Sequence, residues 1–337
     1  MKKNIFNFLV VSISLIVLVT FVLSTQGIGA FMLQVSGLSS RWIAAALFLM
    51  FLYWLFEALS TYVIAHFYRI RYNMIECFAV TMVGQFFNSI TPFASGGQPA
   101  QVVYMMKKGT EAGDAGSVVM IKFFVFQTML TLYSSVIIVF SFTYFKTKIP
   151  LLFTMTFIGL AVNGSMIVLS ILFARNRALT ERILKFIFML VKRMRFIKMT
   201  ESTEKNVERS LQNFHDNAAL LKNNPVLLLK TSILVVLQLT FFFAIPYCVC
   251  ASFGAPIESF FIIFSATVFV VTIVSIVPLP GASGGAEGGF YLFFGLFFKS
   301  SFLVTAILLW RLITYYSCIG LGSIFTIAFP KRTKMPY

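Results

Sequence analysis

Long apolar stretches separated by short polar segments make up most of this chain. A membrane-spanning helix needs about 20 apolar residues. Six stretches reach that length, at residues 5–24, 43–66, 117–143, 150–174, 226–250 and 301–329. The first has no small-residue cleavage site after it, so we expect it to be retained as a helix. The pattern predicts an all-α polytopic membrane protein with about six full spans, forming a single transmembrane domain over residues 1–337.

The basic residues predict how these spans are oriented. The segment from Arg175 to Lys222 holds eleven Lys or Arg against five Asp or Glu, the chain opens with MKK, and KRTK lies three residues before its end. Lys and Arg accumulate in cytoplasmic loops. We therefore expect both termini and this segment to lie on the cytoplasmic side of a bacterial inner membrane.

Within residues 175–224, apolar residues recur at helical spacing, with Lys and Arg on the other faces. This pattern predicts a cytoplasmic amphipathic helical insert that lies in the headgroup plane. A solvated connector with no further role is the alternative.

Two more apolar segments, 76–106 and 257–299, lie between the spans. Counting crossings, the first begins and ends in the cytoplasm and the second begins and ends outside. The apolar run Phe78 to Ile90 is too short to cross, and Pro92 ends it. We expect two re-entrant helical hairpins that enter from opposite faces. For the second, a full span is the alternative, because Ile257 to Val277 is long enough.

The two predicted hairpins share the pattern P-x-A-S-G-G. It occupies Pro92–Gly97 and again Pro280–Gly285, at an offset of 188 residues. An acid opens each preceding apolar run, and a basic residue follows each serine by 27 or 28 positions. Together with the opposite orientations, this indicates an inverted repeat of the kind found in transporters.

Such a repeat predicts one shared binding site. Irregular backbone is tolerated at membrane depth only where protein buries it or where it lines a watery cavity. Helices that start after each Gly-Gly would turn free N–H groups and positive dipole ends toward an anion. The expected lipid-headgroup residues are Asn88, Thr91, Pro92, Ser95, Gly96, Gly97, Gln98, Gln101, Tyr104, Lys122, Pro280, Ser283, Gly284, Gly285, Glu287 and Arg311.

Two cations within apolar helices add to this prediction. A cation inside a span costs about 2.5–3.5 kcal/mol on insertion scales, so it normally faces a cavity or a partner. Lys122 is near its helix start, where snorkelling to the cytoplasm is an alternative. Arg311 is about ten residues into its helix, with Glu287 or Glu57 as its expected partner. The pair would either hold helices together or present a phosphate-binding cation.

These residues resemble the flippase-like transmembrane family that includes the membrane part of lysylphosphatidylglycerol synthases. The stretch PLPGASGGAEGG, with its Glu287, carries the more specific likeness, and SITPFASGGQPAQVVYMMKKG is similar to stand-alone bacterial members. The resemblance implies movement of a lipid between leaflets, often a modified anionic phospholipid. Some relatives carry an aminoacyl-transferase domain after the membrane part, and we expect this chain to be a stand-alone member without one. Gln98 and Gln101 stand where many relatives carry an acid and an arginine.

Composition and charge indicate which ligands and cofactors to expect. Hydrophobic residues make up 59% of the chain and charged residues 11%, with a net charge of +16. In a membrane protein this charge favours anionic lipid as the partner and not nucleic acid. The four cysteines lack metal-like spacing and are expected to be inert. We expect no metal and no cofactor.

The few acids and the two histidines give no catalytic set, so we expect a non-enzymatic lipid flippase. The alternative is a scaffold for a separate lipid-modifying synthase, and assembly as a homo-oligomer is left open.

Overall fold

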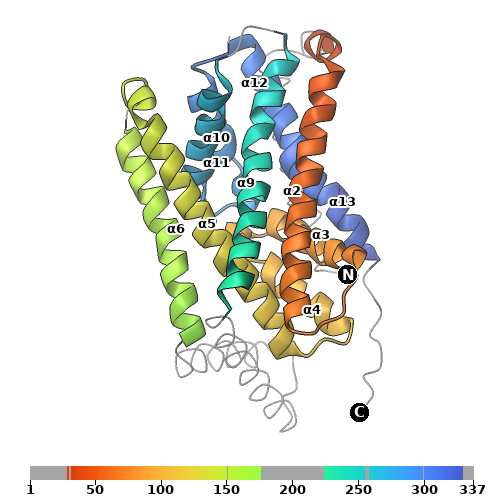
Figure 1. Ribbon diagram of the computed structural model, residues 1–337. Coiled ribbons are helices and arrows are strands. Elements are labelled where there is room, and N and C mark those ends of the chain that lie inside the picture. Colours follow the sequence, from red (N-terminus) through yellow and green to blue (C-terminus); the bar gives the residue numbers. More distant parts are fainter. Residues whose placement is uncertain are drawn as a thin grey trace, which may run out of the picture.

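The computed structural model describes residue 29 and residues 32–149, 151–175, 224–254, 258–298 and 300–328, and every regular element in these ranges is helical (Figure 1). Five helices there are long and apolar enough to cross a membrane. Four are α2 (Ser40–Phe67), α5 (Ala112–Lys146), α6 (Leu152–Arg175) and α9 (Pro225–Ser252). The fifth is continuous through α12 (Ser300–Arg311), η3 (Leu312–Tyr316) and α13 (Ser317–Ile327).

The all-α polytopic prediction is therefore confirmed, and five predicted spans coincide with these helices within a few residues. The sixth, 5–24, lies outside the described residues. So does nearly all of the predicted amphipathic insert, since residues 176–223 are not described.

Shorter helices form two hairpins. The first hairpin comprises α3 (Met74–Ile90), η1 (Pro92–Ala94) and α4 (Gly97–Lys107), and the second comprises α10 (Phe260–Val274), η2 (Pro280–Ala282) and α11 (Gly285–Phe294). The 15 residues of α10 extend about 22 Å at 1.5 Å per residue, less than the roughly 30 Å hydrocarbon core. This length favours the hairpin over the alternative of a full span.

The hairpins point into the bundle from opposite ends (Figure 1). We call the end where α6 finishes and α9 begins the basal end, and the end where α5 finishes and α6 begins the distal end. The first hairpin has both of its outer ends at the basal end, and the second has its outer ends at the distal end. The basal end is the one that the basic residues predict to be cytoplasmic.

Local sequence sets the limits of the first hairpin. At its start, Asn73 and Glu76 form a capping box that satisfies N–H groups of α3. At its turn, Pro92 forces Thr91 into an extended conformation, and α3 ends there. At its mouth, Lys108 donates to Glu76 over 2.8 Å, and this hydrogen bond holds the pKa of Glu76 below its ordinary value.

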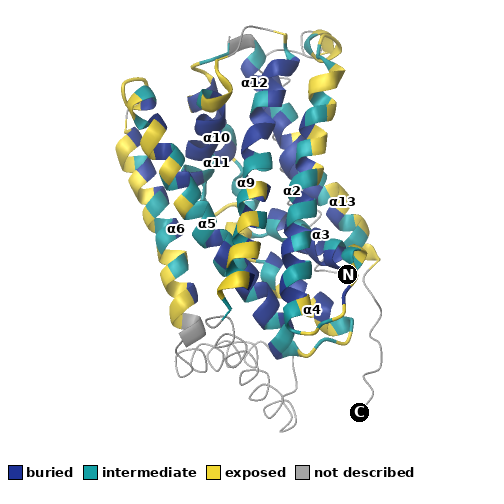
Figure 2. Cartoon of the chain, viewed as in Figure 1, coloured by how far each residue is buried: buried dark blue, intermediate teal, exposed yellow. Residues whose placement is uncertain are grey.

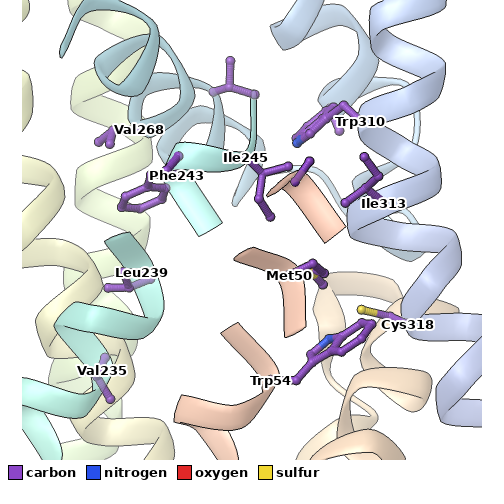
Figure 3. Packing of buried hydrophobic residues seen from close by; sticks show 14 of the residues in the cluster. Met50, Trp54, Val235, Leu239, Phe243, Ile245, Val268, Trp310, Ile313 and Cys318 are labelled. Atoms are coloured by element: carbon purple, nitrogen blue, oxygen red, sulfur yellow. The ribbon is translucent and has the colours of Figure 1, made fainter. Parts of the chain in front are cut away.

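Aromatic packing fixes the second hairpin within the bundle. Phe145 of α5 lies 5.2 Å from Phe269 of α10 and 5.5 Å from Phe293 of α11, measured between ring centroids. Elsewhere in the core, Met50 and Trp54 of α2 pack toward Cys318 of α13 (Figure 3). Such burial shelters the irregular backbone that a broken helix leaves.

Apolar side chains also cover the outside of the bundle. Val139 and Phe140 of α5 and Phe153 of α6 are each at least 70% exposed, and exposed residues follow the outer sides of both helices (Figure 2). This is the surface expected of helices that face lipid.

Candidate functional site

The two P-x-A-S-G-G turns touch each other. η1 and η2 are in direct contact, and η2 also contacts α3. Each turn is the tip of a hairpin that comes from the opposite end of the bundle (Figure 1). The two copies of the sequence repeat thus lie together at one place in the fold.

The repeated residues adopt repeated backbone conformations. Phe93 and Gly281, at matching positions, have φ angles of 53° and 57°, and Ala94 and Ala282 have φ angles of 51° and 49°. Left-handed φ is uncommon for residues with a Cβ, and such strain persists where the surrounding structure imposes it. Both turns therefore hold the same left-handed conformation at these positions, which is strained at Phe93, Ala94 and Ala282.

The serines also make the same contact in both halves. The Ser95 hydroxyl donates to the carbonyl of Pro92 over 2.9 Å, and the Ser283 hydroxyl donates to the carbonyl of Pro280 over 2.9 Å. Ser95 is exposed, as are Pro92 and Ala94 beside it, whereas Ser283 is half-buried. The first turn is thus the more open of the two.

The turns diverge after the serines, where the inner helices begin. Thr91 Oγ1 accepts from the Gly96 N–H over 2.8 Å, and Asn88 Oδ1 accepts from the Gly97 N–H over 2.9 Å. In the second turn, Glu287 Oε2 accepts from the Gly284 N–H over 2.7 Å. The N–H donors of these three glycines are therefore occupied by the protein's own side chains.

The glycines mostly serve close packing within the protein. A Cβ at Gly96 would meet Thr91, one at Gly97 would meet Asn88, and one at Gly285 would meet Val277. Gly284 differs, because it has φ of +83° and no atom within 4 Å of an added Cβ. Of the four glycines, Gly284 alone faces open space within the described part of the chain.

Arg311 lies beside the second turn and is 4% exposed. Its Nη2 donates to Ser283 Oγ over 3.3 Å, and its guanidinium stacks 4.2 Å above the ring centroid of Tyr315. Its Nε lies 2.8 Å from Glu287 Oε1, although the N–H is not aligned for a hydrogen bond. Glu287, and not Glu57, is the partner of Arg311.

Tyr315 joins the two halves of the site, although the sequence pattern did not predict it as a site residue. Its hydroxyl donates over 3.2 Å to the carbonyl of Ser89, in the first hairpin. Its ring fills the space beside Gly281, where an added Cβ would lie 2.0 Å from Cε2. Tyr315 belongs to the π-helical turn η3, a feature frequent at functional sites. Tyr315 follows Arg311 by four residues, a spacing that places both side chains on the same helix face and could have indicated Tyr315 as a site residue.

Lys122 is buried and paired, so the snorkelling alternative is wrong. Its Nζ lies 3.0 Å from Glu57 Oε1, and the two residues are 8% and 9% exposed. Gln101 is also buried, against Gly84, while Gln98 is half-buried at the start of α4. Tyr104 lies near the basal end of α4, beside Lys108. Of these four, only Gln98 lies next to the turns.

Two shallow hollows of about 210 and 420 Å³ lie elsewhere, around residues 33–47 with Phe253, Phe302 and Leu309. Within the described ranges, no group of three His, Cys, Asp or Glu side chains is placed to hold a metal ion. The site is thus defined by the contacting turns and their buried cation.

These features define a multi-pass helical membrane protein with two opposed, broken-helix hairpins. Residues 5–322 match the family model described as Lysylphosphatidylglycerol synthase TM region, and the chain belongs to this family. It is also similar to a UPF0104 membrane protein of Archaeoglobus fulgidus, with 26% identity over 278 residues, or 81% of each chain.

Proposed function

We propose that this protein is a lipid flippase that moves a phospholipid, or a modified phospholipid, between the leaflets of the bacterial inner membrane, with both termini in the cytoplasm. The observation that carries the proposal is the meeting of the two opposed turns beside the buried Arg311. The lipid phosphate would bind at this locus while the acyl chains remain in the surrounding bilayer. No covalent chemistry is required of the protein.

The chemistry of Arg311 supports an anionic guest. A guanidinium carries five N–H donors in a planar fork that matches phosphate oxygens. Ser283 and Glu287 use part of this capacity, and the Nε–H is not aligned with its neighbouring carboxylate. A phosphate could therefore take the place of Glu287, and the charge of the buried cation would remain balanced.

The inverted repeat supports alternating exposure. In repeats of this kind, one half rocks against the other around a central site. Both turns hold the same left-handed conformation at their second and third residues, and Tyr315 links one to the other. We propose that a headgroup meets Ser95 when the site opens to one leaflet and Ser283 when it opens to the other.

Reconstitution tests this proposal. The full chain would be placed in vesicles of phosphatidylglycerol and phosphatidylcholine that carry a trace of headgroup-labelled phosphatidylglycerol, and exposure of the label in each leaflet would be followed over time. We expect exchange well above that of protein-free vesicles. Arg311→Gln should slow it at least about tenfold, equivalent to about 1.4 kcal/mol, at equal amounts of monodisperse protein.

The matched control is Lys148→Gln, because Lys148 is a cation near the distal end that lies over the ring of Tyr144 and outside the site. This variant should exchange lipid at the wild-type rate. Exchange by the wild type no faster than in protein-free vesicles would refute transport and favour the scaffold alternative.

A further inference from the structure

A second pair of buried charges lies apart from the turns. The Glu57 carboxylate on α2 and the Lys122 ammonium on α5 are 3.0 Å apart, and both residues are less than one tenth exposed. Burying two charges carries a large desolvation cost, and hydrophobic residues often replace such pairs without loss of stability. Ionisable residues inside membrane proteins commonly mark ion or proton pathways.

The same carboxylate holds the first hairpin in place. Gln85 of α3 donates from Nε2 to Glu57 Oε2 over 2.5 Å and to the Tyr53 hydroxyl over 3.2 Å. Gln85 precedes Thr91 by six residues, so this contact lies about 9 Å along α3 from the first turn at 1.5 Å per residue. The charge of Glu57 thus helps to hold the first hairpin, which carries this turn, in its position.

The other groups that face this pair are neutral. Tyr53 is on α2, Cys318 on α13 lies near Glu57, and Cys77 on α3 lies near Lys122. From α9, the amide of Gln238 contacts Tyr53. Tyrosine and cysteine ordinarily lose their protons only above neutral pH. Among the described side chains of this cluster, Glu57 is therefore the anionic group, the one whose charge a proton would neutralise.

We propose that Glu57 is a proton-binding site coupled to the lipid site, an inference that rests on lipid transport as the protein's function. A proton added to the Glu57 carboxylate neutralises it and breaks its ion pair with Lys122. The Gln85 contact then changes from a charge-assisted hydrogen bond to a weaker neutral one, which frees the first hairpin to move.

Protonation of Glu57 would also favour the binding of an anion. Lys122 would be left as a buried cation without a counter-ion, a costly state. The negative charge of a lipid phosphate bound at the turns lowers this cost from a distance, so the uptake of one proton and of one anionic headgroup favour each other and together leave the net charge unchanged. Because one proton is linked to each headgroup, binding should strengthen by at most about tenfold per unit fall in pH.

The first test needs no lipid transport. Infrared difference spectra of the purified full chain, recorded between alkaline and acidic pH, should show the C=O stretching band of a protonated buried carboxyl group. Glu57→Gln should lack this band. The double variant Glu57→Gln/Lys122→Gln should lack it too, and it leaves no unpaired buried charge if the single variant fails to fold. A spectrum unchanged by either substitution would overturn the proposal.

The second test measures coupling in vesicles of phosphatidylglycerol and phosphatidylcholine. A pH gradient should accelerate movement of labelled phosphatidylglycerol by the wild type several-fold, and the ratio of rates with and without the gradient should fall to about one in the Glu57 variants. Glu258→Gln is the matched control. Glu258 is an exposed carboxylate that accepts from the Tyr144 hydroxyl, and its variant should keep the full gradient response.

The outcomes separate the two proposals. Lipid movement with a gradient response that survives Glu57→Gln would overturn the proton site and leave the flippase proposal standing. A Glu57 band in a wild-type protein that moves no lipid would refute transport, and with it the coupling, while Glu57 would remain a site of proton uptake.

Discussion

At the scale of single residues, the Glu287 carboxylate pairs with the buried Arg311 where we propose that a lipid phosphate binds. Arg311 is almost fully buried, whereas the side chain of Glu287 is 23% exposed and therefore the more easily displaced partner. Glu287 also caps the Gly284 N–H with its other oxygen. The carboxylate thus has two functions, one electrostatic and one structural.

Glu287→Gln separates these two functions. The amide oxygen still accepts from the Gly284 N–H, but the negative charge that competes with a phosphate is gone. We expect phosphatidylglycerol to bind several-fold more tightly, which native mass spectrometry of the purified variant in lipid titrations would measure. Phosphatidylcholine, which carries no net charge, serves as the control lipid and should gain less. Weaker binding of both lipids would show that Glu287 contacts the headgroup itself and does not compete with it.

At the scale of elements, the contact between η2 and η3 connects the second turn to the last helix. Gly281 has φ of +57°, and the ring of Tyr315 fills the space that a Cβ would take. Tyr315 in turn donates to the carbonyl of Ser89 at the end of α3. A substitution at Gly281 should therefore disturb the packing of both hairpins.

Gly281→Ala should displace the Tyr315 ring and break its hydrogen bond. Losing that bond costs about 1 kcal/mol, and left-handed φ in a residue with a Cβ adds roughly 1–2 kcal/mol. We expect a loss of about 2–3 kcal/mol of unfolding free energy, measured by chemical denaturation in micelles. Gly288→Ala is the control, because an added Cβ there meets no atom within 4 Å and alanine favours a helix. Equal stability of the two variants would show that Tyr315 moves aside without cost.

At the scale of the whole molecule, much of the architecture could be predicted because the bilayer sets strict lengths. Spans follow from runs of apolar residues, and the short run before Pro92 could only form a hairpin. The repeat predicted that the two turns would be equivalent, and their φ angles match at Phe93 and Gly281 and at Ala94 and Ala282 but not at Gly96 and Gly284.

What the sequence could not provide were contacts between elements far apart along the chain. Nothing in the pattern pairs Lys122 with Glu57 or brings Tyr315 to Ser89, because these contacts depend on how the helices pack. The caps on Gly96 and Gly97 were also missed, although Thr91 and Asn88 lie close in sequence. Their side chains bond back only once the chain has turned at Pro92.

The central claim is that lipid crosses at the paired turns, which must separate for this to happen. It is tested most directly by locking them together. In a chain whose four native cysteines are replaced, one cysteine at Ala94 and one at Ala282 would be joined by a short, reductant-cleavable cross-linker. Single-cysteine variants treated with the same reagent control for modification alone.

The measurement is leaflet-resolved exposure of labelled phosphatidylglycerol in vesicles, before cross-linking, after it, and after reduction. We expect the cross-link to stop exchange, reduction to restore it, and both single-cysteine variants to remain active throughout. Exchange at the full rate while the turns are locked would contradict passage of lipid between them.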